Sequence, residues 1–345
     1  ERMRRALKSA DPDAFLLGEV WEDATTKESY NVGRRYALGC GLDSVMNYPF
    51  ANHTVDFLLN RSDAFAYMRF LVSQSQNYPK EMYYALMNLL SSHDVARVRT
   101  VLATGEDGKG MSREEQAKFS APTSAEDDAR GEALVRCAAA LQYSLPGIPV
   151  IYYGDEVGQR GLLDPFNRGT FPARAFDETG TLADWYRALG ALRNARAALR
   201  TGGALYYSTN GDVVGVLRYC LGGKDAFGAP AADEMFLTVV NPDPEPRRIV
   251  VDLRAEKECL SFVDLAFIRA IEPRRAVHLL SSAGENAPQE LREAAEPPTS
   301  AAPESTSERR GLPPGDSDNV VPITSGLLDI SVPPYCAEVF EIEWE

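Results

Sequence analysis

Two carboxylates in this sequence each follow a short apolar run and could work together in one cleft. Glu19 comes directly after the apolar residues 14–18, and Asp94 follows the run 85–90 after a short polar stretch. Cleavage of a glycosidic bond needs one protonated carboxyl group to protonate the leaving oxygen and one ionised carboxylate to form or stabilise the glycosyl intermediate. Glu19 and Asp94 are 75 positions apart, roughly two strand–helix units, so both could reach the same cleft.

The elements that must position these residues alternate between strand-like and helix-like patterns. Short apolar runs that end in polar residues predict strands over 14–18, 41–47, 85–90 and 147–153. Those that precede Glu19, His93 and Asp155 are expected to be buried parallel strands. Helix-like patterns predict helices over 1–9, 52–75, 129–143 and 181–198. This alternation is typical of a parallel α/β fold, in which catalytic residues come from the ends of several strands at one face.

After about residue 202 the pattern changes to short runs with alternating apolar residues. These runs cover 213–219, 235–240, 248–251, 276–280 and 337–342. They predict a small antiparallel β domain, a sandwich. Residues 283–318 are rich in Ala, Pro, Glu and Ser and lack periodicity, which predicts a mobile insertion loop inside that domain. We therefore expect two domains, over 1–200 and 201–345.

Composition argues against several classes of partner. The 345 residues carry a net charge of −14, whereas a nucleic-acid-binding protein would favour a basic patch. No apolar run approaches the roughly 20 residues that span a bilayer. Because CxxC pairs and Cys/His clusters are absent from the sequence, we expect neither a zinc site nor a disulfide framework. Five scattered cysteines are instead expected as free buried thiols, at Cys40, Cys137, Cys220, Cys259 and Cys336.

Several segments, in the required order, resemble the α-amylase superfamily, glycoside hydrolase family 13. Its later motifs are matched by residues 18–21, 92–97 and 147–156, and its neopullulanase and cyclomaltodextrinase branch by 42–50 and 164–168. The resemblance implies that residues 1–200 form the second half of a (β/α)8 TIM barrel. It also implies that the remainder is the family's C-terminal β domain, expected as an antiparallel β-sandwich.

The resemblance assigns roles position by position. It implies that Glu19 is the general acid/base and that Asp94 is the carboxylate that stabilises the oxocarbenium-like transition state. It further implies a set of substrate-binding residues, namely Trp21, His93, Arg97, Asp164 and Arg168. No cofactor is required. Calcium stays an open alternative, although no local cluster has the ligand density of a calcium loop.

One part of the family's machinery is missing from this sequence. The nucleophilic aspartate of the family lies in a Gly-x-Arg-x-Asp motif at the end of the fourth strand, and no such motif occurs here at a suitable place. A retaining double displacement cannot proceed without it. We therefore expect the chain to be the C-terminal part of an enzyme, lacking roughly the first four strands, and to be inactive alone.

The intact enzyme implied by the resemblance hydrolyses α-1,4 or α-1,6 glucosidic bonds with retention, and could also transfer glucosyl groups. Its substrates would be maltooligosaccharides, cyclodextrins or pullulan, with no nucleic acid or membrane as partner. The alternative from another class is a non-catalytic glucan-binding or scaffold protein built on a truncated barrel. Because half a barrel exposes two strand edges, self-association into a homo-oligomer is a further hypothesis.

Structural readings of these residues stay open beside the functional ones. His93 and Asp94 could form a structural hydrogen-bonded pair, Asp164 and Arg168 could form a loop ion pair, and Trp21 could belong to the core. For Asp155 and Glu156, the residues favour a helix cap that orders a loop over direct substrate contact.

Overall fold

The computed structural model describes most of the chain. It covers residues 2–38, 41–121, 124–173, 181–253, 273–283 and 319–344. Residues 284–318 of the predicted insertion loop, together with Cys40 and Cys259, lie outside these ranges. The thiols of Cys137, Cys220 and Cys336 are free and buried, as expected.

Four short parallel strands form the base of the candidate site. They are β1 (Leu17–Gly18), β4 (Ser44–Val45), β5 (Met87–Leu89) and β6 (Ile148–Val150). β1 pairs with β4 and β5 pairs with β6, and a parallel bridge between Met46 and Met87 joins the two pairs. The strands therefore follow one another in chain order, and each predicted apolar run contains a strand.

The prediction of buried strands was wrong for the two outer ones. β4 is buried and most of β5 is too, whereas Leu17 of β1 is 37% exposed and Ile148 of β6 is 43% exposed. The reason is their position in the order, because β1 and β6 each have a strand partner on one side only among the described residues. An edge strand keeps one side open to solvent.

Local capping signals explain where several helices begin. The side chains of Asp63 and Ser124 cap α3 (Ala64–Asn77) and α7 (Ala125–Ser144), and Ser112 forms a capping box with Glu115 at α6. The helical pattern over 52–75 divides into two helices, α2 (Tyr48–Leu58) and α3. The other helices are α1 (Arg2–Ala10), α4 (Lys80–Ala85), α5 (Val98–Thr104), α6 (Arg113–Ser120), α9 (Leu182–Ala195) and α10 (Ala197–Thr201), with the short 3-10 helices η1 (Asp155–Val157) and η2 (Phe166–Arg168).

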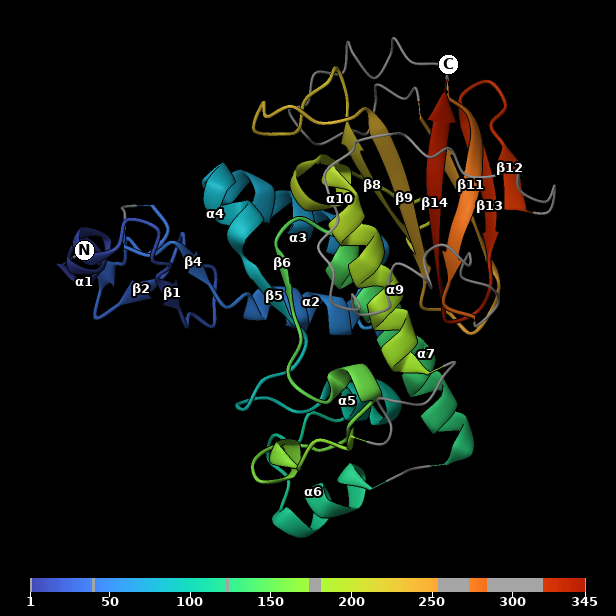
Figure 1. Cartoon of the computed structure of the whole chain (residues 1–345). Helices are drawn as coiled ribbons and strands as arrows, with labels where there is room; N and C mark the ends of the chain where they lie inside the picture. The colour runs from blue at the N-terminus through green and yellow to red at the C-terminus, as the bar shows by residue number, and fades with distance from the viewer. Residues whose placement is uncertain are drawn as a thin grey trace.

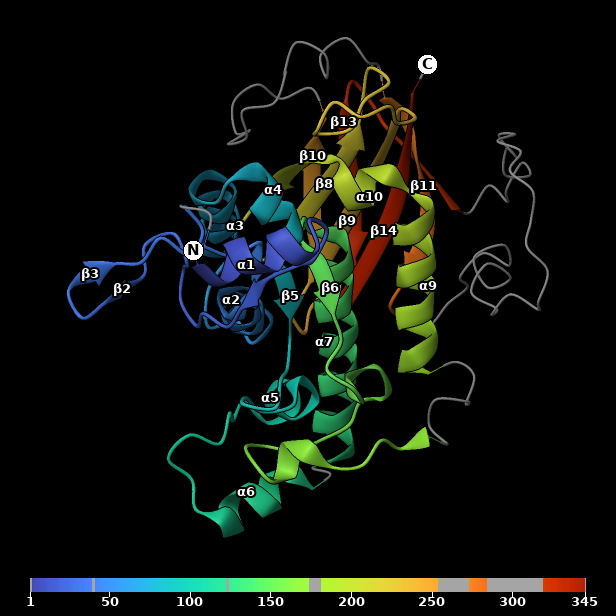
Figure 2. The ribbon, with the colours of Figure 1, turned by 60° about the vertical axis from the view of Figure 1, so that its left-hand side comes forward.

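A small hairpin in the loop after β1 was not predicted. β2 (Glu28–Ser29) and β3 (Val32–Gly33) pair in antiparallel fashion across a two-residue turn at Tyr30 and Asn31, both with positive φ. The hairpin extends away from the rest of the molecule (Figure 2). A two-residue turn with positive φ at both positions is of type I′, which favours Asn or Gly there, so Tyr at the first position is not a signal for such a turn.

The C-terminal part contains a six-stranded antiparallel sheet in the order β12-β11-β14-β9-β8-β7. A separate antiparallel pair of strands, β10 and β13, packs its apolar residues Ile249, Leu328 and Ile330 against one face of that sheet. The strands are β7 (Gly203–Tyr207), β8 (Val214–Cys220), β9 (Glu234–Asn241), β10 (Arg247–Asp252), β11 (Pro273–Ser281), β12 (Val320–Pro322), β13 (Leu327–Val332) and β14 (Cys336–Trp344).

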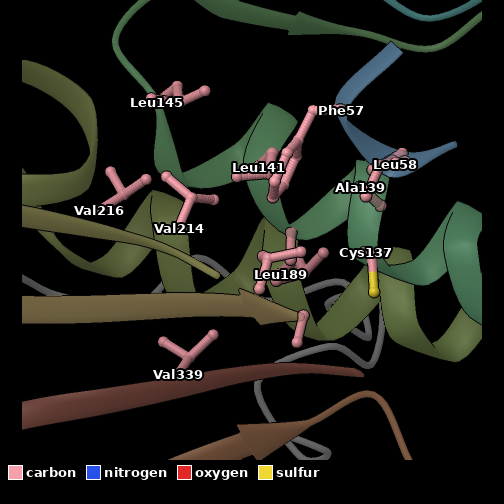
Figure 3. Close-up of a cluster of buried hydrophobic side chains, with 14 of the residues drawn as sticks. Phe57, Leu58, Cys137, Ala139, Leu141, Leu145, Leu189, Val214, Val216 and Val339 are labelled. Atoms are coloured by element: carbon pink, nitrogen blue, oxygen red, sulfur yellow. The ribbon is translucent and has the colours of Figure 1, made fainter. Parts of the chain in front are cut away.

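Helices α7 and α9 cover the other face of the six-stranded sheet (Figure 1). Leu141 of α7 and Leu189 of α9 belong to one buried cluster with Val214, Val216 and Val339 of the sheet (Figure 3). On its opposite side α7 reaches the parallel strands, because Gln142 Nε2 donates to the backbone carbonyls of β5 and β6 at 2.7 and 2.9 Å. The core is thus continuous across residue 200, and the predicted domain boundary there stays a prediction.

A buried arginine connects the helices to the sheet. Arg218 of β8 is fully buried and donates to four carbonyls, those of Ser144 (2.6 Å), Leu199 (3.1 Å), Gly202 (2.9 Å) and Gly203 (3.1 Å). Ser144 ends α7 and Leu199 lies in α10, so the guanidinium satisfies carbonyls that helix ends leave unpaired.

Among the described residues, none of the helices combines the length and apolar character needed to cross a membrane.

Arg218→Met should destabilise the protein strongly, because it keeps an apolar stem but leaves buried carbonyls without donors. We expect the free energy of unfolding to fall by about 3 kcal/mol in urea titrations followed by tryptophan fluorescence. Arg248→Met is the control, since Arg248 pairs with Asp329 at the surface, and should leave the free energy of unfolding almost unchanged. Equal losses in the two variants would contradict the assigned role.

Candidate active site

A hydrogen-bonded path connects the loop after β1 to the loop after β5. The Tyr48 hydroxyl donates to Glu19 Oε1 at 3.2 Å and lies 3.2 Å from Ser92 Oγ. The backbone N–H of Asp94 in turn donates to Ser92 Oγ at 3.1 Å. Glu19 and Asp94, which the sequence predicted for one cleft, are therefore linked through two intervening side chains.

The donor in each hydrogen bond of this path can be assigned. Burial raises the pKa of Tyr48 to about 12, with the nearby charge of Glu19 contributing to this rise and the hydrogen bond from Ser92 opposing it. The phenol therefore keeps its single proton and donates it to the Glu19 carboxylate. Because that proton is used, the Ser92 hydroxyl must be the donor in its contact with Tyr48.

Trp21 is not a core residue. Its ring stacks on Tyr48 with a centroid distance of 4.0 Å and an interplanar angle of 4°. The residue is still 45% exposed, so Tyr48 covers part of it and the rest faces solvent. An exposed indole beside Glu19 offers an apolar surface for a flat ligand.

His93, Asp94, Asp164 and Arg168 form a connected polar group at the surface. His93 Nε2 lies 3.2 Å from Asp94 Oδ2, and their side chains are 50% and 37% exposed. Arg168 approaches Asp94 Oδ1 at 3.9 Å and Asp164 Oδ2 at 3.3 Å. Both pairs considered from the sequence thus form, and all four side chains stay accessible to a ligand.

Arg97 is placed differently from these predicted substrate-binding residues. It is 0% exposed, its Nη1 lies 3.1 Å from Asp155 Oδ1, and its guanidinium stacks over the rings of Tyr152 and Tyr153. Its Nε donates to the carbonyl of Asn167 at 2.9 Å. This position leaves no surface for a sugar, so the geometry favours a role in holding the surrounding loops over the expected contact with substrate.

Asp155 orders its loop, as expected, but not as a helix cap. The residue starts the three-residue helix η1, and its carboxylate pairs with Arg97. Burial raises the pKa of Asp155 to about 7, while hydrogen bonds from Ser91 and Arg97 and the charge of Arg97 act in the opposite direction. Glu156 Oε2 accepts the backbone N–H of Gly154 at 2.7 Å and closes the same turn.

Sequence reasoning missed two residues that organise the site. The sequence does not distinguish packing from cleft lining for Tyr48, although this residue comes directly after the second predicted strand. Asn167 belongs to the 164–168 motif but received no role. In the described part of the chain no group of three or more His, Cys, Asp or Glu residues could hold a metal ion.

Comparison with known proteins identifies the family. The sequence profile described as "Alpha amylase, catalytic domain" matches residues 1–178, more than half of the chain. The chain belongs to the α-amylase family. The resemblance found in the motifs is thereby confirmed, and so is an α-amylase catalytic-domain fold of the TIM-barrel type.

The relatives of this α-amylase family member are much longer proteins. An amylopullulanase of Thermoanaerobacter thermohydrosulfuricus is 33% identical over 272 residues, which cover 76% of this chain and 17% of that protein. A cyclomaltodextrinase of a Bacillus species is 35% identical over 203 residues, covering 58% of this chain and 30% of the relative. A solved cyclomaltodextrinase structure matches 98% of this chain and 42% of its own, with a TM-score of 0.61 and 22% identity, which shows the fold.

The buried carboxyl of Asp155 should make stability depend on pH. The pKa of an aspartate is ordinarily 3.8, and the fold raises that of Asp155 to about 7. At pH values between these two, the folded protein binds more protons than the unfolded chain. The free energy of unfolding should therefore decrease as the pH rises from about 4 to about 7.

Asp155→Asn removes this titration, so its stability relative to the wild type should improve across that interval in urea titrations. Asp329→Asn, at an exposed carboxylate whose pKa is lowered by Arg248, should not flatten the curve between pH 5 and 7. Parallel pH profiles for the wild type and Asp155→Asn would show that the buried carboxyl stays ionised.

Proposed function

We propose that this chain carries the acid/base and the transition-state-stabilising carboxylate of a retaining α-glucan hydrolase. Glu19 is the general acid/base and Asp94 is the stabilising carboxylate. The observation that supports this most is the path Glu19–Tyr48–Ser92–Asp94, with contacts of 3.1 to 3.2 Å. It links the Glu19 carboxylate to the backbone of Asp94, and cooperating groups from separate strand ends need such a fixed relation.

In the proposed reaction Glu19 protonates the leaving glycosidic oxygen and later takes a proton from the attacking water. Asp94 accepts hydrogen bonds from sugar hydroxyls as positive charge develops on the ring. The nucleophile that forms the glycosyl intermediate would come from outside residues 1–345, because these residues hold no Gly-x-Arg-x-Asp motif at a suitable place.

The remaining accessible residues would bind the sugar. Trp21 presents an exposed aromatic face beside Glu19, and His93 lies against Asp94. Asp164 and Arg168 form an exposed ion pair that reaches toward Asp94, a position suited to glucose units next to the reacting one. Arg97 would position the loops from beneath.

The proposed substrates are maltooligosaccharides, cyclodextrins or pullulan, with α-1,4 or α-1,6 bonds cleaved and glucosyl transfer as a second outcome. The names of the relatives, amylopullulanase and cyclomaltodextrinase, support this class. The four parallel strands would be the second half of a (β/α)8 barrel, and residues 201–345 a C-terminal β-sandwich domain packed against it. The open edges of β1 and β6 leave self-association as part of the same proposal.

A non-catalytic glucan-binding or scaffold protein is the competing function. It would use the same exposed residues, because Trp21 and the ion pair of Asp164 with Arg168 require no nucleophile. Binding of maltotriose without turnover by the full encoded protein would favour this alternative.

In the full encoded protein, Glu19→Gln and Asp94→Asn should each lower kcat by roughly 100-fold or more, because each removes a group needed in the transition state. Stability should change by less than about 1 kcal/mol, since both side chains are exposed. Glu22→Gln is the matched control. Glu22 lies three positions after Glu19, is exposed, and pairs with Lys27. Near-normal turnover in either test variant would refute its assignment.

Purified residues 1–345 alone should release no reducing sugar from maltooligosaccharides, cyclodextrin or pullulan, because a covalent intermediate cannot form without the nucleophile. A reducing-sugar assay with prolonged incubation tests this expectation. Release that disappears in Glu19→Gln would show that the nucleophile lies within the chain after all.

A further inference from the structure

Asn167 lies beneath the loop that carries His93 and Asp94. The residue is fully buried in η2, the short helix after β6. Its Nδ2 donates to the carbonyls of Ser92, His93 and Val95 at 3.3, 3.1 and 2.9 Å. One amide group therefore holds the backbone on both sides of Asp94.

The carbonyl groups around the Asn167 side chain determine which way its amide is turned. Nδ2 faces three carbonyl oxygens, whereas Oδ1 is buried and has no hydrogen-bond partner among the described residues. The flipped amide would point an oxygen at all three carbonyls, which is repulsive. The site thus needs a planar group with two N–H donors, which asparagine supplies at this length.

Asn167 is itself held firmly. The backbone carbonyl of Asn167 accepts a hydrogen bond from Arg97 Nε at 2.9 Å, and Arg97 in turn pairs with Asp155. The next residue, Arg168, donates from Nη2 to the carbonyl of His93 at 3.1 Å. The loop is therefore secured by Asn167 from the buried side and by Arg168 from the exposed side.

We propose that Asn167 is a positioning residue that sets the orientation of the Asp94 carboxylate through the backbone of residues 92–95. This inference rests on the proposed function of Asp94. Residues 92–95 belong to neither a helix nor a strand, so no regular ladder fixes their carbonyls. Displacement of a catalytic group by about 1 Å can cost roughly 100-fold in rate, so a single amide at this place can control turnover.

Asn167→Asp in the full encoded protein tests this role, because it keeps the shape and replaces the donors by an acceptor. We expect kcat on maltotriose to fall by roughly 100-fold with little change in KM, since the loss concerns the transition state. Hydrogen exchange of the amides of residues 92–97 should rise by about tenfold, with the remaining core unchanged. Asn167→Ser, which keeps one donor, should have an intermediate kcat and covers the case in which the Asp variant does not fold.

Asn241→Asp is the matched control. Asn241 is also fully buried, and its Nδ2 also donates to three carbonyls, those of Glu245, Val332 and Pro333 at 2.9 to 3.1 Å, but in the β sheet region. The Asn241→Asp substitution should lower the Tm, while kcat and the hydrogen exchange of the amides of residues 92–97 stay at wild-type values.

Equal kcat in folded Asn167 and Asn241 variants, or unchanged exchange at 92–97, would overturn the inference. Failure of the proposed function is seen separately, as turnover insensitive to Glu19→Gln. If the protein turns nothing over, kcat cannot serve as a readout, and maltotriose affinity is expected to change little in either variant. The sign of the affinity change then decides nothing, and hydrogen exchange takes its place: a rise at residues 92–97 in Asn167→Asp but not in Asn241→Asp supports the positioning role, and equal exchange in the two variants overturns it.

Discussion

A buried network of side-chain amides holds the two halves of the candidate site together. Asn47, at the end of β4, donates from Nδ2 to Asn88 Oδ1 of β5 at 2.9 Å and accepts from Gln74 Nε2 of α3 at 2.8 Å. Gln142 of α7 donates to the Asn88 carbonyl at 2.7 Å. Beside this network a single parallel bridge joins β4 to β5. The relative position of the loops that carry the two proposed carboxylates therefore depends on these amides.

Polar groups do this work better than apolar ones because they are directional. A buried N–H group is costly unless it finds an acceptor, so a slip of one strand past the other would leave several donors unsatisfied. The same reasoning applies at the surface end of the strands, where Asn167 and Arg97 satisfy carbonyls of irregular loops. Each short strand alone offers few ladder bonds, and side-chain amides and guanidinium groups supply the rest.

The sequence predicted those features that depend on neighbouring residues. Apolar runs located all four parallel strands, and motif spacing placed Glu19 and Asp94 at strand ends. It could not predict the contacts of Tyr48 with Glu19 and Ser92, which join segments 29 and 44 positions apart. The burial of Arg97 was missed for the same reason, because it follows from a pairing with Asp155 across 58 positions. A motif shows that an arginine is present but not which way it faces.

The antiparallel sheet is part of the scaffold of the site. Residues 137–141 of α7 are all fully buried, so this helix is covered on every side. One side faces the sheet through Val214 and Val339, and the other bonds β5 and β6 through Gln142. Without the sheet, the apolar side of α7 would face water, which is unfavourable. A shift of α7 away from its present place would withdraw Gln142 from both strands. The geometry of the loops after β5 and β6 therefore depends on packing far from any reacting atom.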